Sequence, residues 1–433
     1  MGARMGEWGA ACIAQARWPA APAGRGAGSS SMLGWRAMST PPGASAAGGG
    51  DRAKLMAAAC AGTFVFGIAI AMLGALLPAL FDKVGFDKAA AGNLFMIGTA
   101  GMLVMSLLFG PLVDRFGFRT FLIVSALLVV GAFALMTVAS TYGLVAFAAV
   151  LMGLGGGGLN GGTNALASDI HEPAARGSAL NLLGVFLGVG ALTIPLLIGS
   201  LFTSLGLSTI LLLAVAMSLV PPVYFAMLEF PAAKQAQGFP LADAAALFKD
   251  PLLWVCGLLL FFESANEATV AGWISTYVQE STGAATSAAA LILAGYWAML
   301  MVGRIVASRA VGILGEMKLV LAGAVIALGA LALVRYSSSG VLATAGVLIL
   351  GFGFAAIVPT TMAVLGTAYA RVSGTVFGLA YGVGIAGGMV APWLVGRVAQ
   401  ASSLRQGLTL TVVCGVMVVA LQLVAMRVQK RPG

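Results

Sequence analysis

The stretch FFESANEATVAGWISTY, residues 261–277, places two carboxylates inside an apolar span that opens near Pro251. In a helix, at 100° per residue, the polar and aromatic residues of this stretch fall within one arc of about 120°. The rest of the span is mainly Leu, Val and Ala. That arc holds Glu263, Asn266, Glu267, Val270, Trp273 and Tyr277. A carboxylate at the middle of a membrane helix costs about 2.5–3.5 kcal/mol, so two of them require a wet cavity or partners. We expect a functional polar site here; the alternative is a pair of glutamates buried against neighbouring helices or near a helix end.

Composition defines the class of protein. The 433 residues are 60% hydrophobic and only 9% charged, with a mean hydropathy of +1.02, whereas a soluble domain is about 25% charged. This composition predicts an all-α, polytopic membrane protein in contact with the lipid bilayer. The net charge of +9 comes from Lys and Arg scattered singly between apolar spans, so we expect no nucleic-acid partner.

Twelve apolar spans follow the first 53 residues, each near the roughly 20 residues that cross about 30 Å of hydrocarbon. They run about 57–80, 91–109, 120–139, 143–167, 178–201, 208–228, 251–278, 288–306, 319–334, 340–363, 374–395 and 408–426. The longest interior polar stretch divides them six and six. The predicted segments are a disordered tail (1–53), an N-terminal six-helix half (54–228), a cytoplasmic linker (229–250) and a C-terminal six-helix half (251–433). The tail is either a transit-like presequence or the product of a start codon assigned too early.

The basic residues predict an orientation. With both termini in the cytoplasm, the outer loops carry five of the 23 Lys and Arg residues and 18 remain inside, as the positive-inside bias requires. The five are Lys83, Lys88, Arg335, Arg397 and Arg405. We therefore expect a multi-pass protein of the cell (inner) membrane, working as a monomer.

An internal repeat relates the two halves of the chain. Its first copy is Gly153-x-Gly155 followed by Gly190-x4-Pro195-x3-Gly199, and its second is Gly351-x-Gly353 followed by Gly387-x4-Pro392-x3-Gly396. The offset is 198 residues at the first glycine and 197 at the last. The repeat predicts two parallel six-helix pseudo-repeats, an arrangement that places the solute site near the bilayer midplane between the halves. The glycines of the run 153–158 are expected to allow close helix packing.

Between the second and third spans stands GPLVDRFGFR, residues 110–119. The spacing of its Gly, Asp-Arg, Gly and Arg resembles the signature loop of the major facilitator superfamily, which that family carries at the same place. The resemblance implies the major facilitator fold, with a cytoplasmic gate at which the acid and the arginines pair with neighbouring helix ends. The gating candidates are Gly110, Asp114, Arg115, Gly117 and Arg119, with Arg304 from a looser counterpart in the second half. An ordinary topogenic charge cluster would explain the arginines but not the glycine spacing.

Three further stretches are similar to the branch that contains the fucose permease and related glucose and galactose transporters. They are Glu267 with Gly272-Trp273, Asn164 to Arg176 and Leu180-Asn181, and Gly351-x-Gly353 to Pro359-Thr360, Arg371 and Gly374. The resemblance covers most of the chain from about residue 57. It implies a sugar-type solute carrier, often coupled to protons, that works by alternating access.

The chain departs from that branch at two positions, where Gly74 and Asn160 stand in place of acidic residues. Any coupled proton is then expected on Glu267, with Glu263 as the second host. In the competing hypothesis of a facilitator, Glu267 only hydrogen-bonds solute hydroxyls.

The candidate solute-binding residues are amides and aromatics near the acids. Asn160 and Asn164, one turn apart, bind a solute or bridge helices. Tyr296, Trp297 and Trp273 stack on a sugar ring or belong to an outer aromatic belt. The predicted set is Asn160, Asn164, Asn266, Glu267, Trp273, Tyr296 and Trp297.

Residues for enzymatic chemistry are not recognisable in the sequence: we find no nucleophile with its base, no metal-ligand spacing and no nucleotide-binding cassette. We therefore predict no enzyme and no cofactor. The predicted function is secondary transport of a sugar or sugar-like metabolite. The alternatives are an efflux antiporter for amphipathic compounds and a transporter-like receptor that binds without translocating.

Overall fold

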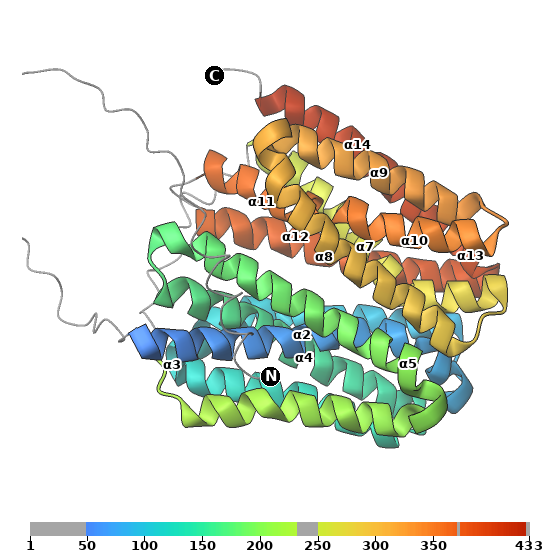
Figure 1. Ribbon diagram of the computed structural model, residues 1–433, viewed down its shortest axis with the longest axis horizontal. Coiled ribbons are helices and arrows are strands. Elements are labelled where there is room, and N and C mark those ends of the chain that lie inside the picture. The colour runs from blue at the N-terminus through green and yellow to red at the C-terminus, as the bar shows by residue number, and fades with distance from the viewer. Residues whose placement is uncertain (1–48, 232–249, 370–372, 430–433) are drawn as a thin grey trace, which may run out of the picture. The chain divides into compact units, whose positions relative to one another are not determined.

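The computed structural model describes residues 49–231, 250–369 and 373–429. Most of the predicted tail and linker lies outside these residues, although the last residues of the tail, from Gly49, already belong to a helix. Within the described ranges every regular element is helical (Figure 1). The helices are α2 (Gly49–Val84), α3 (Lys88–Val138), α4 (Tyr142–Ile170), α5 (Pro173–Met227), α7 (Pro251–Thr282), α8 (Thr286–Leu314), α9 (Glu316–Tyr336), α10 (Gly340–Phe354), α11 (Ile357–Ala368), α12 (Ser373–Ala401), α13 (Leu404–Gly407) and α14 (Thr409–Gln429).

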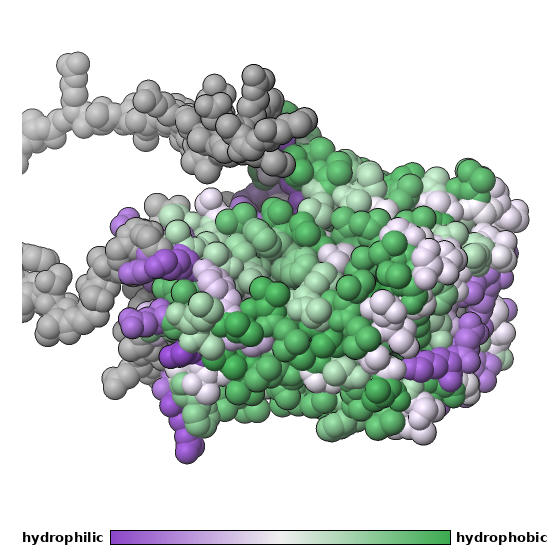
Figure 2. Space-filling model, turned by 60° about the horizontal axis from the view of Figure 1, so that its bottom comes forward, coloured by the Kyte–Doolittle hydropathy of each residue, from purple (hydrophilic) through white to green (hydrophobic). Residues whose placement is uncertain are grey.

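Ten helical segments of the described chain are long and apolar enough to cross a membrane. Figure 2 shows the corresponding surface, in which a broad apolar band separates hydrophilic residues at the two ends. Only helices and closed barrels satisfy their backbone hydrogen bonds within hydrocarbon, and this chain uses helices. The protein is therefore an integral, multi-pass membrane protein with an all-helical fold.

The 51-residue helix α3 folds back on itself at Gly117. Gly117 has φ 77° and ψ 161°, a conformation that residues with a Cβ rarely adopt. Tyr142, just past the end of α3, donates its hydroxyl to the carbonyl of Ala90 at 3.2 Å, and Lys83, just before its start, donates to the carbonyl of Thr137 at 3.0 Å. The two ends of α3 therefore lie together, and its two arms run in opposite directions.

The 55-residue helix α5 reverses in the same way at Gly206, which has φ 71° and ψ 169°. Gly190 on its first arm lies against Phe64 of α2, and Phe225 on its second arm lies against Gly62. Because Gly62 and Phe64 are neighbours on α2, the two arms pack side by side. Gly117 and Gly206 lie at opposite ends of the helices, which we call the Gly117 end and the Gly206 end.

The helices form two bundles. In the first, α2, α3, α4 and α5 pack on one another, and in the second α7 packs on α12 and α14, with α8, α9 and α10 alongside. Figure 1 shows the first bundle in blue to green and the second in yellow to red. The bundles meet mainly along the helix pairs α2 with α7, α3 with α12, and α5 with α8.

Equivalent glycine contacts hold the helices of each bundle together. At several glycines a Cβ would overlap a backbone carbonyl oxygen of the neighbouring helix, so no larger residue fits without a shift, and four of these contacts form two matching pairs. These four contacts are Gly153 on Gly98, Gly351 on Tyr296, Gly190 on Phe64 and Gly387 on Phe261. The first two pairs are related by 198 residues at both partners, and the last two by 197. The glycine repeat of the sequence is therefore also a repeat of tertiary contacts.

Two of the predicted boundaries differ from the observed ones. The stretch 110–119 was expected to be a loop between spans, but it is helical except at Gly117, where α3 turns. The predicted span 340–363 is broken near Ala355 and Ala356, between α10 and α11. In the first case the helices extend past the apolar segment, and only the residue with positive φ interrupts them.

We expect the glycine contacts to be strict steric requirements. Gly387→Ala adds a Cβ that overlaps the Phe261 carbonyl, so it should destabilise the protein by about 1–3 kcal/mol. Gly382→Ala is the matched control, because a Cβ at Gly382 on the same helix meets nothing within 4 Å. Apparent melting temperatures of the two purified variants, measured in detergent, test the expectation. Equal melting temperatures would show that α7 and α12 are not held at contact distance.

Candidate functional site

The two acids of α7 lie in different surroundings. Glu263 is fully buried, and neither of its carboxylate oxygens has a hydrogen-bond partner among the described residues. Glu267, one turn further along, is partly exposed and lies within electrostatic reach of Arg304 on α8. The predicted pair of acids is therefore a buried carboxyl group next to an accessible one.

Arg304 reaches from α8 toward the other bundle. Its Nη1 donates to the carbonyl of Gly184 on α5 at 3.4 Å, a long contact. Its Nε is buried and has no acceptor within the described part of the chain. The charged atoms of Arg304 and Glu267 do not approach within the 4.0 Å of an ion pair. The guanidinium therefore retains unused donors at the seam between the bundles.

Tyr296 and Trp297 of α8 extend this polar group on its Gly206 side. Their rings lie 5.3 Å apart in an edge-on arrangement at 72°. Both are buried, and among the described residues the hydroxyl of Tyr296 and the Nε1 of Trp297 lack hydrogen-bond partners. Tyr296 lies within electrostatic reach of Glu263, Glu267 and Arg304. The two aromatic residues therefore belong to the same polar group as the acids.

Tyr381 of α12 is a member of this group that the sequence analysis missed. Its side chain is 52% exposed, although the residue lies well inside its helix and within electrostatic reach of both Arg304 and Glu267. The exposed side chain shows that open space adjoins Tyr381. The sequence signal for it is a tyrosine in the middle of an apolar span.

The group lies near the middle of the membrane-crossing helices that carry it. At 1.5 Å per residue, Glu267 is within about 1 Å of the centre of α7, and Glu263 is about 5 Å from it toward the Gly117 end. On the same scale Arg304 and Asn160 lie about 6 Å from the centres of α8 and α4, also toward the Gly117 end. Glu263, Arg304 and Asn160 therefore lie at similar distances from the centres of their helices, on the same side.

Asn160 and Asn164 bind each other. The amide nitrogen of Asn164 donates to the backbone carbonyl of Asn160 at 2.8 Å and to its Oδ1 at 3.0 Å. Both residues are partly exposed on α4. These bonds do not use the amide nitrogen of Asn160 or the Oδ1 of Asn164, which remain able to contact a solute.

Three other residues of the predicted polar face of α7 make contacts between helices. Asn266 is 1% exposed, and its amide, oriented to satisfy both groups, donates to the carbonyl of Thr411 at 2.9 Å and accepts from the amide of Gly415 at 3.2 Å. The buried indole of Trp273 donates to the carbonyl of Pro392 at 3.0 Å. Tyr277 donates its hydroxyl to the carbonyl of Val334 at 2.8 Å. The structure thus separates these side chains from the group around Glu267.

Gly74 lies where α2 crosses α7 between the bundles. A Cβ at Gly74 would overlap the carbonyl oxygen of Ala271. An acidic side chain does not fit at this crossing. The departure from the fucose permease pattern at Gly74 therefore has a packing reason.

The bundles are joined at the Gly206 end. Lys88 forms an ion pair with Glu280 at 2.8 Å, and its backbone amide donates to the side chain of Gln400 at 3.1 Å. The indole of Trp393 donates to Oδ1 of Asn93 at 3.1 Å. Arg304 and Tyr381 lie on the Gly117 side of this closure.

The predicted gating stretch lies at the Gly117 end. Asp114, Arg115 and Arg119 are exposed, and Arg119 donates to the carbonyl of Ala226, close to the end of α5. Arg115 lies 5.3 Å from the ring centre of its neighbour Phe116. Gly117 makes the turn, whereas a Cβ at Gly110 would meet open space.

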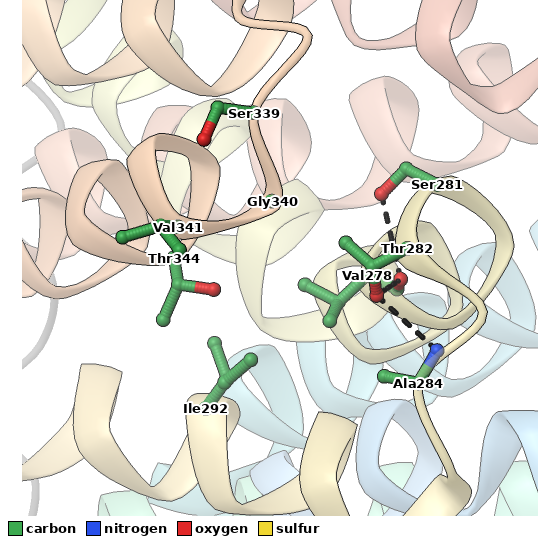
Figure 3. A pocket seen from close by; sticks show the side chains of 9 residues that line it. All are labelled: Val278, Ser281, Thr282, Ala284, Ile292, Ser339, Gly340, Val341 and Thr344. Carbon is green, nitrogen blue, oxygen red and sulfur yellow. Dashed lines mark hydrogen bonds between the residues drawn. The ribbon is translucent and has the colours of Figure 1, made fainter.

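A separate hollow of about 550 Å³ lies at the Gly206 end of the second bundle. Figure 3 shows Val341 and Thr344 of α10 facing Val278 and Thr282 of α7, with Ile292 of α8 on the third side. The hydroxyl of Thr282 is already bonded to the carbonyl of Val278 at 2.7 Å. The lining is mainly apolar and contains none of the predicted site residues.

Comparison with known proteins indicates one family. The family model described as Major Facilitator Superfamily matches residues 59–392. An uncharacterised MFS-type transporter of Yersinia pestis is 25% identical over 355 residues, which cover 79% of this chain and 88% of that protein.

Solved structures share the fold. A crystal structure of the nucleoside transporter NupG superposes with a TM-score of 0.72 at 14% identity and covers 88% of this chain and 100% of that one. A D-xylose-proton symporter superposes with a TM-score of 0.71 at 16% identity and covers 87% and 97% of the two chains. These matches are to transporters and not to enzymes.

The ion pair at the Gly206 end should bias the conformation of the protein. Lys88→Glu places like charges opposite each other at Glu280, which should favour separation of the bundles at this end by about 0.2–1 kcal/mol. We expect a reporter Asn93→Cys, in a chain with Cys12→Ser, to react with a polar maleimide up to about five-fold faster. Adding Glu280→Lys restores an attractive pair and should return the rate to that of the parent. Unchanged labelling in Lys88→Glu would exclude a latch at this place.

Proposed function

We propose that the chain, which belongs to the Major Facilitator Superfamily, is a secondary transporter. It would move a small polar solute across the membrane by alternating access. The observation that carries the proposal is the group formed by Glu267 and Arg304, two opposite charges near the membrane centre that are not in contact. Charged residues at this depth are costly, and in transporters they mark solute or ion pathways. The seam between bundles is also where such proteins bind solutes.

The proposed topology is twelve membrane crossings in two parallel halves of six. The reversals of α3 at Gly117 and α5 at Gly206 each convert one long helix into two crossings, and the paired glycine contacts support the repeat. We place both termini in the cytoplasm, on the basis of the positive-inside bias. The Gly117 end is then cytoplasmic, and the conformation described here is closed toward the outside. The proposed membrane is the cell (inner) membrane, and the proposed working unit is a monomer.

The proposed solute site combines parts of both bundles. Asn160 and Asn164 supply amide groups from α4, and Glu267, Tyr296 and Trp297 supply polar and aromatic groups from α7 and α8. Tyr381 joins them because its exposed side chain faces the same charges. We assign Asn266 and Trp273 to packing, since their polar atoms are bonded to neighbouring helices.

Hydroxyl-rich solutes such as sugars suit this mixture of amides and aromatic rings. The resemblance to the fucose permease branch and the fold shared with a D-xylose-proton symporter support that choice. We further propose coupling to protons through Glu267 and Glu263. Buried or half-buried carboxyl groups at the centre of a transporter are suitable hosts for a proton that is taken up on one side and released on the other.

Two alternatives differ in what they predict. An efflux antiporter would extrude amphipathic compounds and would not accumulate polar metabolites. A receptor would bind its solute in detergent but show no flux in proteoliposomes. Uptake of a panel of labelled sugars, sugar acids and nucleosides, with and without a pH gradient, separates both from the proposed transporter.

Removing the charge of Glu267 should uncouple transport. We expect Glu267→Gln to retain exchange of solute between the two sides of a proteoliposome but to lose accumulation driven by a pH gradient, because the amide cannot carry the proton. Glu316→Gln, at the start of α9, is the matched control and should transport normally. If the parent protein itself shows no accumulation in a pH gradient, the facilitator hypothesis replaces coupling.

Asp114 should act on the gate and not on solute affinity. Asp114→Asn is expected to change the balance between inward-open and outward-open states and to lower the transport rate, because the carboxylate lies about half a bilayer from the site. Solute affinity in a chain locked in one conformation should stay within about two-fold of the parent. Labelling of cysteines at the two ends reports the balance. A large loss of affinity with unchanged labelling would contradict the assignment to the gate.

A further inference from the structure

Arg304 lies about 6 Å from the centre of α8, well inside this membrane-crossing helix. Its one hydrogen bond in that part, to Gly184, is long at 3.4 Å, and its buried Nε has no acceptor. Desolvating a guanidinium without filling its donors is costly, and such groups persist where a ligand completes them. The unused donors therefore require an explanation beyond helix packing.

The charges around Arg304 leave room for a ligand. Glu267 on α7 is the acid that it senses, and Glu263, one turn back on the same helix, lies within electrostatic reach of Glu267. The tyrosines of α8 and α12, Tyr296 and Tyr381, lie in the same field. From α5 the neighbouring group is the carbonyl of Gly184. A pair that served only to cancel two charges would be expected to close to contact, but here the charged atoms stay more than 4.0 Å apart. Open space next to Tyr381 gives access to the gap.

We infer that Arg304 anchors an anionic group of the transported solute, and that the solute is a small carboxylate. The inference rests on the proposed transport function and names its substrate class. A guanidinium offers a planar pair of N–H donors that matches both oxygens of a carboxylate, and an unused Nε is one of the donors such a fork employs. Hydroxyl groups on the rest of the solute would meet Tyr381 and the amides of Asn160 and Asn164.

Glu267 then makes anion binding depend on a proton. While Glu267 is ionised, its charge competes with the solute carboxylate for Arg304 and repels it. When Glu267 takes up a proton, Arg304 is free for the solute, so proton and anion bind together. One proton and one carboxylate are carried without net charge, which lowers the cost of moving them through the membrane interior.

The test uses the purified full chain in detergent and three matched pairs of probes. These are D-gluconate and D-glucose, lactate and 1,2-propanediol, and benzoate and benzyl alcohol. We expect at least one carboxylate to raise the melting temperature while its neutral partner does not. Arg304→Gln should weaken that carboxylate about 10- to 100-fold. Arg309→Gln, about one and a half turns further along α8, should leave it unchanged.

The pH dependence provides a second readout. Affinity for the carboxylate should fall as the pH rises in the parent protein, and Glu267→Gln should bind it with little dependence on pH. If Arg304→Gln does not fold, Arg304→Lys, which keeps the charge but loses the planar fork, serves in its place and should bind the carboxylate more weakly. The inference is overturned if no carboxylate stabilises the parent, if the neutral probes do so instead, or if the Arg304 variant keeps parental affinity.

Proteoliposomes distinguish this inference from the transport proposal. Exchange of a neutral solute that is insensitive to Arg304 would leave the transporter standing and remove the anion site. Binding of a carboxylate that depends on Arg304, with no exchange of that carboxylate or of any other probe, would leave the anion site standing and remove transport.

Discussion

Direct contact between helix backbones at glycine is the constraint on which the rest of this structure depends. Within hydrocarbon, apolar side chains gain little by leaving lipid for protein, so helices associate through close packing and polar contacts. In this chain α2 meets α5, α3 meets α4, α7 meets α12 and α8 meets α10 where a glycine faces a carbonyl. The same geometry occurs at matching positions of both bundles, which is how one packing solution organises most of the chain.

This constraint also decides where charge can be placed. At Gly74 the crossing of α2 and α7 leaves no room for a side chain, so the first bundle cannot supply an acid there. The intramembrane acids instead lie on α7, about one turn (Glu267) and two turns (Glu263) from the crossing at Ala271. Glu267 consequently faces α8, and the opposite charge available to it is Arg304. The arrangement of the site follows from the packing of the seam beside it.

The sequence was informative about the periodicity of each helix and less informative about which side chains contact one another across helices. Apolar spans, the glycine offset and the acids of α7 were all visible, because each is a property of one helix or of its repeat. Asn266, Trp273 and Tyr277 were placed on the same arc as the acids, but an arc of 120° on a buried helix faces several neighbours. Their polar atoms found carbonyls and an amide on α14, α12 and α9, and no helical projection contains that information. Tyr381 was overlooked for the complementary reason, since its importance comes from charges on two other helices.

Because charges are weakly screened in a low-dielectric interior, the balance among Glu263, Glu267 and Arg304 sets the electrostatic cost of this site. Glu263 has no cation within reach and no hydrogen-bond partner among the described residues, so an ionised carboxylate there would have nothing to offset its desolvation. Glu267 and Arg304 offset each other in part, but their separation leaves each with unfilled hydrogen-bonding capacity. A ligand that fills this capacity gains more than it would at the surface, because water no longer competes for the same donors. Binding one solute and one proton between the bundles therefore changes the electrostatic free energy of these three groups. That change can favour one arrangement of the bundles over the other.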